Sequence, residues 1–139
     1  MTLMSLVLIH REMRKKKYRS RIILSVHDSI IFDLHRDEAV EVMAMAKRIM
    51  EDLPNLSDQV LPGLDWSWLK CPIVADSELG TTWAMLQGVD IEALENEGHE
   101  PEEDLWEWDD EKESWSVIRD AETFEELDEI MEWKASKAA

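Results

Sequence analysis

The sequence has few basic residues, little cysteine and no long apolar run, and each shortage excludes a class of protein. Lys and Arg total 15 against 32 Asp and Glu, for a net charge of -17. The whole molecule therefore cannot bind nucleic acid by charge attraction alone. The single Cys71 excludes an internal disulfide and fits a reducing compartment. The longest nearly apolar run, Leu3–Ile9, is far shorter than a membrane span, and we expect neither a signal peptide nor a membrane anchor.

The negative charge is concentrated in the last third of the chain. Residues 1–86 carry 11 basic and 12 acidic residues, whereas residues 87–139 carry 4 and 20. A length of 139 residues fits one compact domain with an appendage. We therefore predict a main segment over 1–87, an acidic linker over 88–104 and a small acidic hairpin and helix over 105–139.

The start of the chain predicts a helix followed by a β-hairpin. Apolar residues over 2–13 follow helical spacing on nearly all sides of the first turns, which is typical of a buried helix. Two short β-branched runs, 21–26 and 30–35, are separated by His27, Asp28 and Ser29. This pattern predicts two antiparallel strands joined by a tight turn.

The rest of the main segment predicts a second helix and a third strand. Asp37 is expected to cap a helix that runs to about Leu53 and ends at Pro54. Residues 72–76 predict a strand, and Trp83 is expected in the core. The fold class is therefore α+β, with an antiparallel sheet and helices packed against it.

The acidic C-terminal part is rich in tryptophan. Residues 105–120 suggest a hairpin, and residues 121–136 suggest a closing helix with capping-box spacing between Thr123 and Glu126. Four tryptophans are expected to bind a partner protein: Trp106, Trp108, Trp115 and Trp133. The acidic part could instead mimic the charge of DNA, or be a small accessory domain that improves solubility.

Asp28 is the strongest candidate for chemistry in the main segment. A hairpin turn presents a side chain on a rigid scaffold, and a carboxylate there suits Mg²⁺. A His-Asp dipeptide between strands is, by itself, more often an ordinary turn. The surrounding sequence therefore decides between the two interpretations.

That surrounding sequence resembles the C-terminal palm of A-family DNA polymerases. RIILSVHDSIIFDL is followed by a helix that ends in RIMED and then by LKCPIVADSELGTTWAML. In the family, a His-Asp hairpin called motif C precedes a helix, a strand and a Gly-x-x-Trp ending. The resemblance covers about residues 3–86 and implies a palm-type sheet. Ser29 and the loop around DWSWL look most like phage members.

The resemblance implies roles for the residues of the turn. Asp28 corresponds to the motif C aspartate that helps hold two catalytic Mg²⁺ ions, which activate the primer 3′-hydroxyl and stabilise the pyrophosphate. His27 matches a histidine close to the primer terminus, although it could also pack behind the hairpin. Ser29 stands where many members have Glu. Primer–template DNA and dNTP are the implied substrates.

Several parts of an A-family polymerase have no counterpart in this sequence. These are the motif A aspartate, the fingers helix and the thumb. The resemblance therefore implies either the small subunit of a split polymerase or a fragment, completed by a larger chain with motif A and fingers. The apolar helix at Leu3–Ile9 would form part of the joint.

A basic run precedes the hairpin and could contact DNA. The expected phosphate contacts are Arg14, Lys15, Lys16, Lys17, Arg19 and Arg21. The plainer interpretation is a solvated helix end.

Two other functions fit parts of the pattern. Single-subunit RNA polymerases also have a His-Asp-Ser motif C, but Phe-Gly commonly follows there, whereas this chain has Ile30 and Ile31. The chain could also be a non-catalytic acidic subunit of a replication complex. Its acidic part could dock on a processivity factor or a single-strand binding protein. We expect a cytoplasmic location, in a host cell if the chain is phage-encoded.

Overall fold

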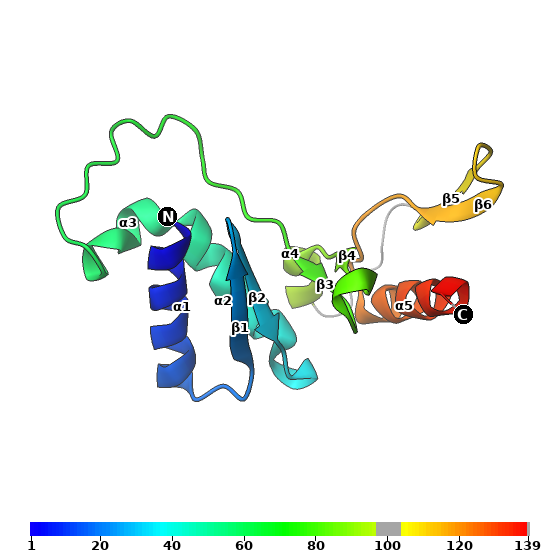
Figure 1. The fold of residues 1–139 in the computed structure, drawn as a ribbon, viewed down its shortest axis with the longest axis horizontal. Coiled ribbons are helices and arrows are strands. Elements are labelled where there is room, and N and C mark those ends of the chain that lie inside the picture. Colours follow the sequence, from blue (N-terminus) through cyan, green and yellow to red (C-terminus); the bar gives the residue numbers. More distant parts are fainter. Residues whose placement is uncertain (97–103, 139) are drawn as a thin grey trace. The chain divides into compact units, whose positions relative to one another are not determined.

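The computed structural model describes residues 1–96 and 104–138, which fall in two compact units, Met1–Ala75 and Asp76–Ala139. Helices and two-stranded antiparallel sheets occur in both units, which confirms the α+β class (Figure 1). Contacts define these units, whereas the charge asymmetry set the predicted boundary near residue 87. The division into the three segments stays a prediction. No helix in the described ranges is long and apolar enough to cross a membrane.

Two helices hold the core of the first unit. Helix α1 (Thr2–Lys16) packs against helix α2 (Ala39–Glu51), and Ile9 and Val42 are fully buried in the core they share. Leu3 is 75% exposed, so α1 is buried along one stripe and not on nearly all sides as its sequence predicts.

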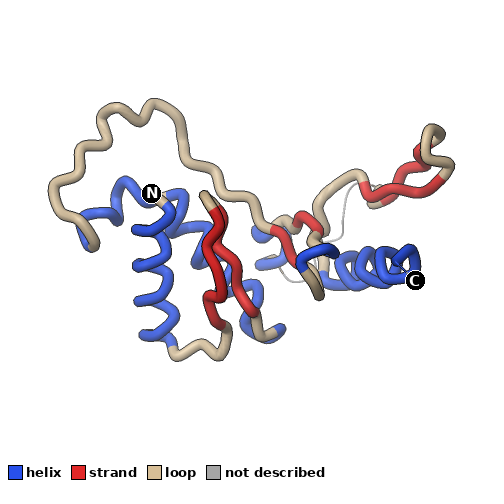
Figure 2. Tube along the Cα trace, in the orientation of Figure 1, coloured by secondary structure: helices blue, strands red, loops and turns tan. Residues whose placement is uncertain are grey.

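The predicted hairpin is present and packs on this core. Strand β1 (Arg21–Val26) pairs antiparallel with β2 (Ser29–Asp33), and a two-residue turn joins them (Figure 2). Ile22, Ile30 and Phe32 pack against the core formed by the helices. The register shifts between Ile22 and Leu24, so one extra residue is accommodated in β1.

The second helix begins differently from the prediction. A 3₁₀ turn, η1 (Arg36–Glu38), precedes α2, whose start has no side-chain cap. Asp37 does not cap it, because the Asp37 carboxylate lies 3.2 Å from an Arg19 nitrogen. The helix also ends two residues before the predicted Leu53. Pro54 instead lies in the first turn of α3 (Leu53–Leu56), where no intrahelical hydrogen bond is lost. A 3₁₀ turn, η2 (Ser57–Gln59), follows.

The strand predicted at residues 72–76 is wrong. These residues have no strand pairing in the structure. The backbone of Ala75 finds side-chain partners instead. Its N–H donates to Glu51 at 3.1 Å, and its carbonyl accepts from Lys47 at 2.7 Å. These two contacts satisfy the polar groups of a buried residue without a neighbouring strand.

The second unit begins with a small sheet. Strands β3 (Glu78–Leu79) and β4 (Gln87–Gly88) flank the 3₁₀ turn η3 (Trp83–Met85). A Cβ at Gly80 would lie 2.5 Å from the Met85 carbonyl oxygen, so only glycine allows the chain to fold back here. Trp83 is 61% exposed and is not the core residue that we predicted, because this turn lies at the surface.

A short helix lies inside the segment that was predicted to be a linker. Helix α4 (Ile91–Glu95) buries Ile91 and Leu94, and the Asp90 carboxylate accepts from two N–H groups of its first turn. Asp90 therefore caps a short helix, which we did not predict because the segment is so acidic. Residues 97–103 of the predicted linker lie outside the described residues.

The C-terminal residues form a hairpin and a helix, as their sequence predicts. Strand β5 (Trp106–Asp109) pairs with β6 (Ser114–Val117), and α5 (Phe124–Ala138) closes the chain. The Thr123 hydroxyl accepts from the Glu126 N–H, while the Glu126 carboxylate accepts from the Glu122 N–H. Helix α5 packs through Leu127, Ile130 and Met131.

Candidate functional site

The β1–β2 turn consists of His27 and Asp28, and both side chains are exposed. The backbone of His27 is left-handed, with a φ of 54°. Two-residue hairpin turns favour this conformation at their first position, and histidine tolerates it better than most residues. Because the strands are packed on a helical core, the turn presents Asp28 from a fixed base. The His27 side chain is exposed on the turn, and its role stays a prediction.

Asp28 supplies one carboxylate with the chemistry that Mg²⁺ prefers. Across residues 1–96 and 104–138, no group of three or more His, Cys, Asp or Glu is placed to hold a metal ion. One carboxylate does not organise two ions that lie about 3.5–4 Å apart. Asp28 therefore fits a shared metal site but does not form one with its described neighbours.

The hairpin has a second apolar face that turns away from the core. Leu24 and Val26 of β1 pair with Ile31 and Ser29 of β2 on this face, opposite to Ile30. Leu24 is 48% exposed and Val26 is 37% exposed, and Ile23 at the register shift is 64% exposed. A contiguous apolar surface therefore runs along the strand that leads to Asp28, which is typical of an interaction surface.

A partly buried network joins the base of the hairpin to the start of α2. The Glu38 carboxylate accepts from the N–H groups of Ser20 and Arg19, each at 2.9 Å, and from the Ser20 hydroxyl at 2.8 Å. The same hydroxyl accepts from the His35 N–H at 2.9 Å. These hydrogen bonds, foremost that from the Ser20 backbone, lower the pKa of Glu38 to about 2. The network therefore holds together the segments that enter β1 and leave β2, at the base of the hairpin.

The lowered pKa of Glu38 makes the stability of the first unit depend on pH. The folded pKa of about 2 lies below the ordinary value of 4.5, so Glu38 stabilises the fold fully above about pH 5 and loses this effect as pH falls toward 2. We expect Glu38→Gln to lower the free energy of unfolding at pH 6. The decrease of this free energy between pH 6 and pH 3 should also be smaller than in the wild type. Urea unfolding followed by circular dichroism measures both. A Glu92→Gln control, exposed in the second unit, should keep the wild-type pH dependence; an unchanged profile in Glu38→Gln would contradict the assignment.

The structure separates the six basic residues by their partners. Lys16 lies 2.7 Å from Glu41, and Arg19 lies 3.1 Å from Glu38. Lys15 is 76% exposed and 3.5 Å from Glu12. The remaining three are exposed and form no ion pair with a residue that the structure describes: Arg14, Lys17 and Arg21. Three of the six, Lys15, Lys16 and Arg19, thus have an acidic partner, and the other three have none among the described residues.

The four tryptophans of the C-terminal part also separate into two pairs. The rings of Trp106 and Trp133 meet at 5.0 Å and an angle of 65°, and both residues are half-buried. Those of Trp108 and Trp115 meet at 5.7 Å and 76° but remain exposed. The first pair joins the β5–β6 hairpin to helix α5. Of these four tryptophans, only Trp108 and Trp115 are open to solvent.

The chain belongs to DNA polymerase family A, because the sequence profile of that family matches residues 1–85. The DNA polymerase of Bacillus phage SP01 is 37% identical over 98 residues, which is 70% of this chain and 10% of the phage protein. DNA polymerase I of Streptococcus pneumoniae TIGR4 is 30% identical over 66 residues, or 48% of this chain and 6% of that protein. The chain therefore spans a tenth or less of these relatives. No solved structure matches it.

Proposed function

We propose that this chain supplies the motif C hairpin of the palm of a template-directed DNA polymerase, with Asp28 as a ligand of the catalytic Mg²⁺. The exposed carboxylate at the tip of a core-anchored hairpin, inside the family segment, carries the proposal. When bound, Mg²⁺ activates the primer 3′-hydroxyl toward the dNTP and stabilises the departing pyrophosphate. His27, next to Asp28 on the same turn, contacts the primer terminus.

The site is completed by residues outside this chain, in a larger polypeptide that carries motif A and the fingers. The apolar outer face of β1, with Ile23, Leu24 and Val26 exposed, supports this proposal because it borders Asp28 and suits an extended hydrophobic joint. Helix α1 contributes less to such a joint than its sequence suggests, since Leu8 and Ile9 are already buried in the unit's own core. Such a role places the chain in the cytoplasm, that of a host cell if it is phage-encoded.

Phosphate contacts come from the three unpaired basic residues, Arg14, Lys17 and Arg21. In the assembly that contains this chain, we expect Arg14→Ala and Lys17→Ala each to weaken DNA binding at every sequence and to reduce the salt slope of log K by about 1. Fluorescence anisotropy of a labelled primer–template from 50 to 300 mM salt measures this slope. Lys70→Ala, an exposed control outside the basic run, should leave it unchanged, and equal slopes for all variants would exclude these contacts.

The acidic second unit docks the chain on another replication protein, such as a processivity factor or a single-strand binding protein. Its excess of carboxylates and its exposed tryptophans support this role, because aromatic anchors and charge complementarity commonly fix partners. Docking through this unit does not depend on the chemistry at Asp28.

The proposed function is tested by primer extension with the natively purified assembly. Mass spectrometry of that preparation identifies the polypeptide that copurifies. We expect Mg²⁺-dependent incorporation of dNTP and not of NTP, in line with relatives that are named DNA polymerases. Preferential incorporation of NTP would instead support the RNA polymerase interpretation.

A further inference from the structure

The outer half of the β5–β6 hairpin carries an exposed pair of tryptophans. Trp108 lies directly opposite Trp115 in the strand register, and their rings meet edge to face. Trp108 is 47% exposed and Trp115 is 54% exposed. Two large adjacent apolar side chains left open to solvent mark an interaction surface.

The arrangement of the hairpin explains why this pair and not the other is open. Side chains alternate across a strand, so Trp106 and Trp108 share one face of β5, and Trp115 and Val117 share the same face of β6. At the inner end of that face, Trp106 contacts Trp133 of helix α5. Trp106 and Trp133 therefore hold the hairpin on the helix and leave the outer pair as the accessible surface.

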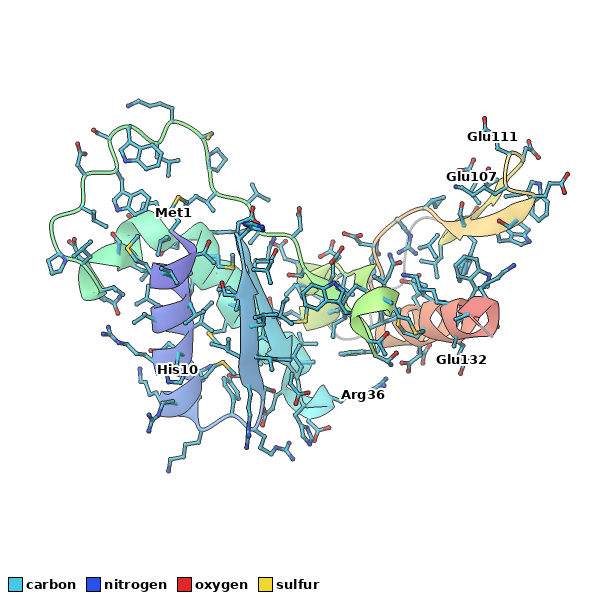
Figure 3. The ribbon with its side chains drawn as sticks, in the orientation of Figure 1. Met1, His10, Arg36, Glu107, Glu111 and Glu132 are labelled. Atoms are coloured by element: carbon cyan, nitrogen blue, oxygen red, sulfur yellow. The ribbon has the colours of Figure 1, made fainter. Side chains whose placement is uncertain are left out.

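The charge around the outer pair selects the kind of partner. Residues 104–118 carry six carboxylates and one lysine. That lysine, Lys112, is already paired with Asp109 at 2.6 Å. Glu107 and Glu111 are exposed and extend from the hairpin into solvent (Figure 3). Glu107 lies on the face opposite Trp108, whereas Glu111 belongs to the exposed turn at 110–113, which adjoins the tryptophan pair. An apolar pair thus lies beside a negatively charged turn, which attracts cations and repels polyanions.

We infer that Trp108, Trp115 and the carboxylates of the adjoining turn form a docking surface for a lysine- and arginine-rich segment of a partner polypeptide. Guanidinium and ammonium groups stack on exposed indole faces and pair with flanking carboxylates at the same time. The same unit already contains one such contact, because the Lys137 ammonium lies 5.9 Å from the Trp133 ring centre. This inference specifies the docking role proposed above and is independent of the polymerase assignment.

Single-stranded nucleic acid is the main rival occupant, because its bases also stack on tryptophan. A strand on Trp108 and Trp115 would bring its phosphates next to the carboxylates of the hairpin, and the Asp109 contact already occupies Lys112. No counterion release by basic residues would support such binding there. The basic side chains of a cationic polypeptide can both stack on the indole rings and pair with the carboxylates.

The test measures binding of a fluorescein-labelled decaarginine peptide to the whole 139-residue chain by anisotropy at 100 mM salt. Removing both rings in Trp108→Ala/Trp115→Ala should weaken binding about tenfold, although the net charge is unchanged. Trp83→Ala, which removes another exposed tryptophan of the second unit, should change it less than twofold. Asp110→Asn/Glu111→Gln in the adjoining turn should also weaken binding several-fold, whereas the matched pair Glu125→Gln/Glu129→Gln on α5, equally neutralising, should have a smaller effect.

Near-ultraviolet and far-ultraviolet circular dichroism of each variant separates loss of the surface from loss of the fold. Should the double tryptophan variant misfold, Trp108→Phe/Trp115→Phe replaces it, and weaker binding is still expected because phenylalanine is a poorer partner for cations. Equal binding by wild type and a folded tryptophan variant would overturn the inference. So would tryptophan-dependent binding of a labelled ten-residue oligothymidylate. Asp28→Asn, which lies outside the second unit, should bind the peptide as the wild type does, so either proposal can fail alone.

Discussion

Asp28→Asn is expected to abolish Mg²⁺-dependent primer extension by the assembly that contains this chain, with a loss on the order of 10³-fold or more. The amide keeps the size of the carboxylate but loses the negative charge that binds a hard cation. Because Asp28 is exposed on a turn, the substitution removes no core packing and should leave the stability of the chain within about 0.5 kcal/mol. Loss of catalysis with intact folding separates a metal ligand from a turn former.

Asp33→Asn is the matched control for this experiment. Asp33 is also an exposed aspartate of the hairpin, but it lies at the far end of β2, opposite Arg21. We expect it to retain most of the activity. Copurification of the partner polypeptide should be the same for both variants. Wild-type extension by Asp28→Asn, measured under single-turnover conditions, would defeat the assignment of motif C.

Ile9→Ala is expected to lower the free energy of unfolding of the first unit by about 2–5 kcal/mol. Ile9 is fully buried between the helices, so its truncation removes apolar contacts and leaves a cavity that the neighbouring side chains fill only in part. Urea unfolding followed by circular dichroism at 222 nm measures the loss. Because the hairpin packs on the same core, the variant should also weaken the support of Asp28.

Leu3→Ala on the same helix provides the comparison. Leu3 is 75% exposed, so the same kind of truncation removes little buried area and should cost less than about 0.5 kcal/mol. In the assembly, however, Leu3 is available to a partner polypeptide. A loss of stability that Leu3→Ala shows only in the assembly would indicate that Leu3 contacts this partner. Equal losses for Ile9→Ala and Leu3→Ala in the isolated chain would show that the helix is packed differently.

The hairpin was the part of the site that local sequence could predict. The two β-branched runs and the three residues between them predicted a tight turn. The structure leaves two residues in that turn, because Ser29 pairs with Val26. The exposure of Asp28 follows from that turn. Its role in catalysis came from the resemblance of a longer segment, because a His-Asp dipeptide has no unique chemistry.

Several of the errors concern residues whose partners are distant in sequence. Asp37 has a suitable type and place for a helix cap, but Arg19 binds its carboxylate. Residues 72–76 read as a strand, yet Glu51 and Lys47 satisfy the Ala75 backbone. The Glu38 network was missed altogether, because no spacing rule connects it with Ser20.

The amino-acid order alone thus determined the class of fold, the hairpin, the charge asymmetry and the family, since these depend on neighbours in sequence and on composition. Only the folded chain decided which lysines and arginines are already neutralised, which tryptophans stay open to solvent and which face of the hairpin is left uncovered. Those outcomes depend on which side chains of separate elements lie next to one another in the folded chain. Tertiary packing, and not local preference, decides this.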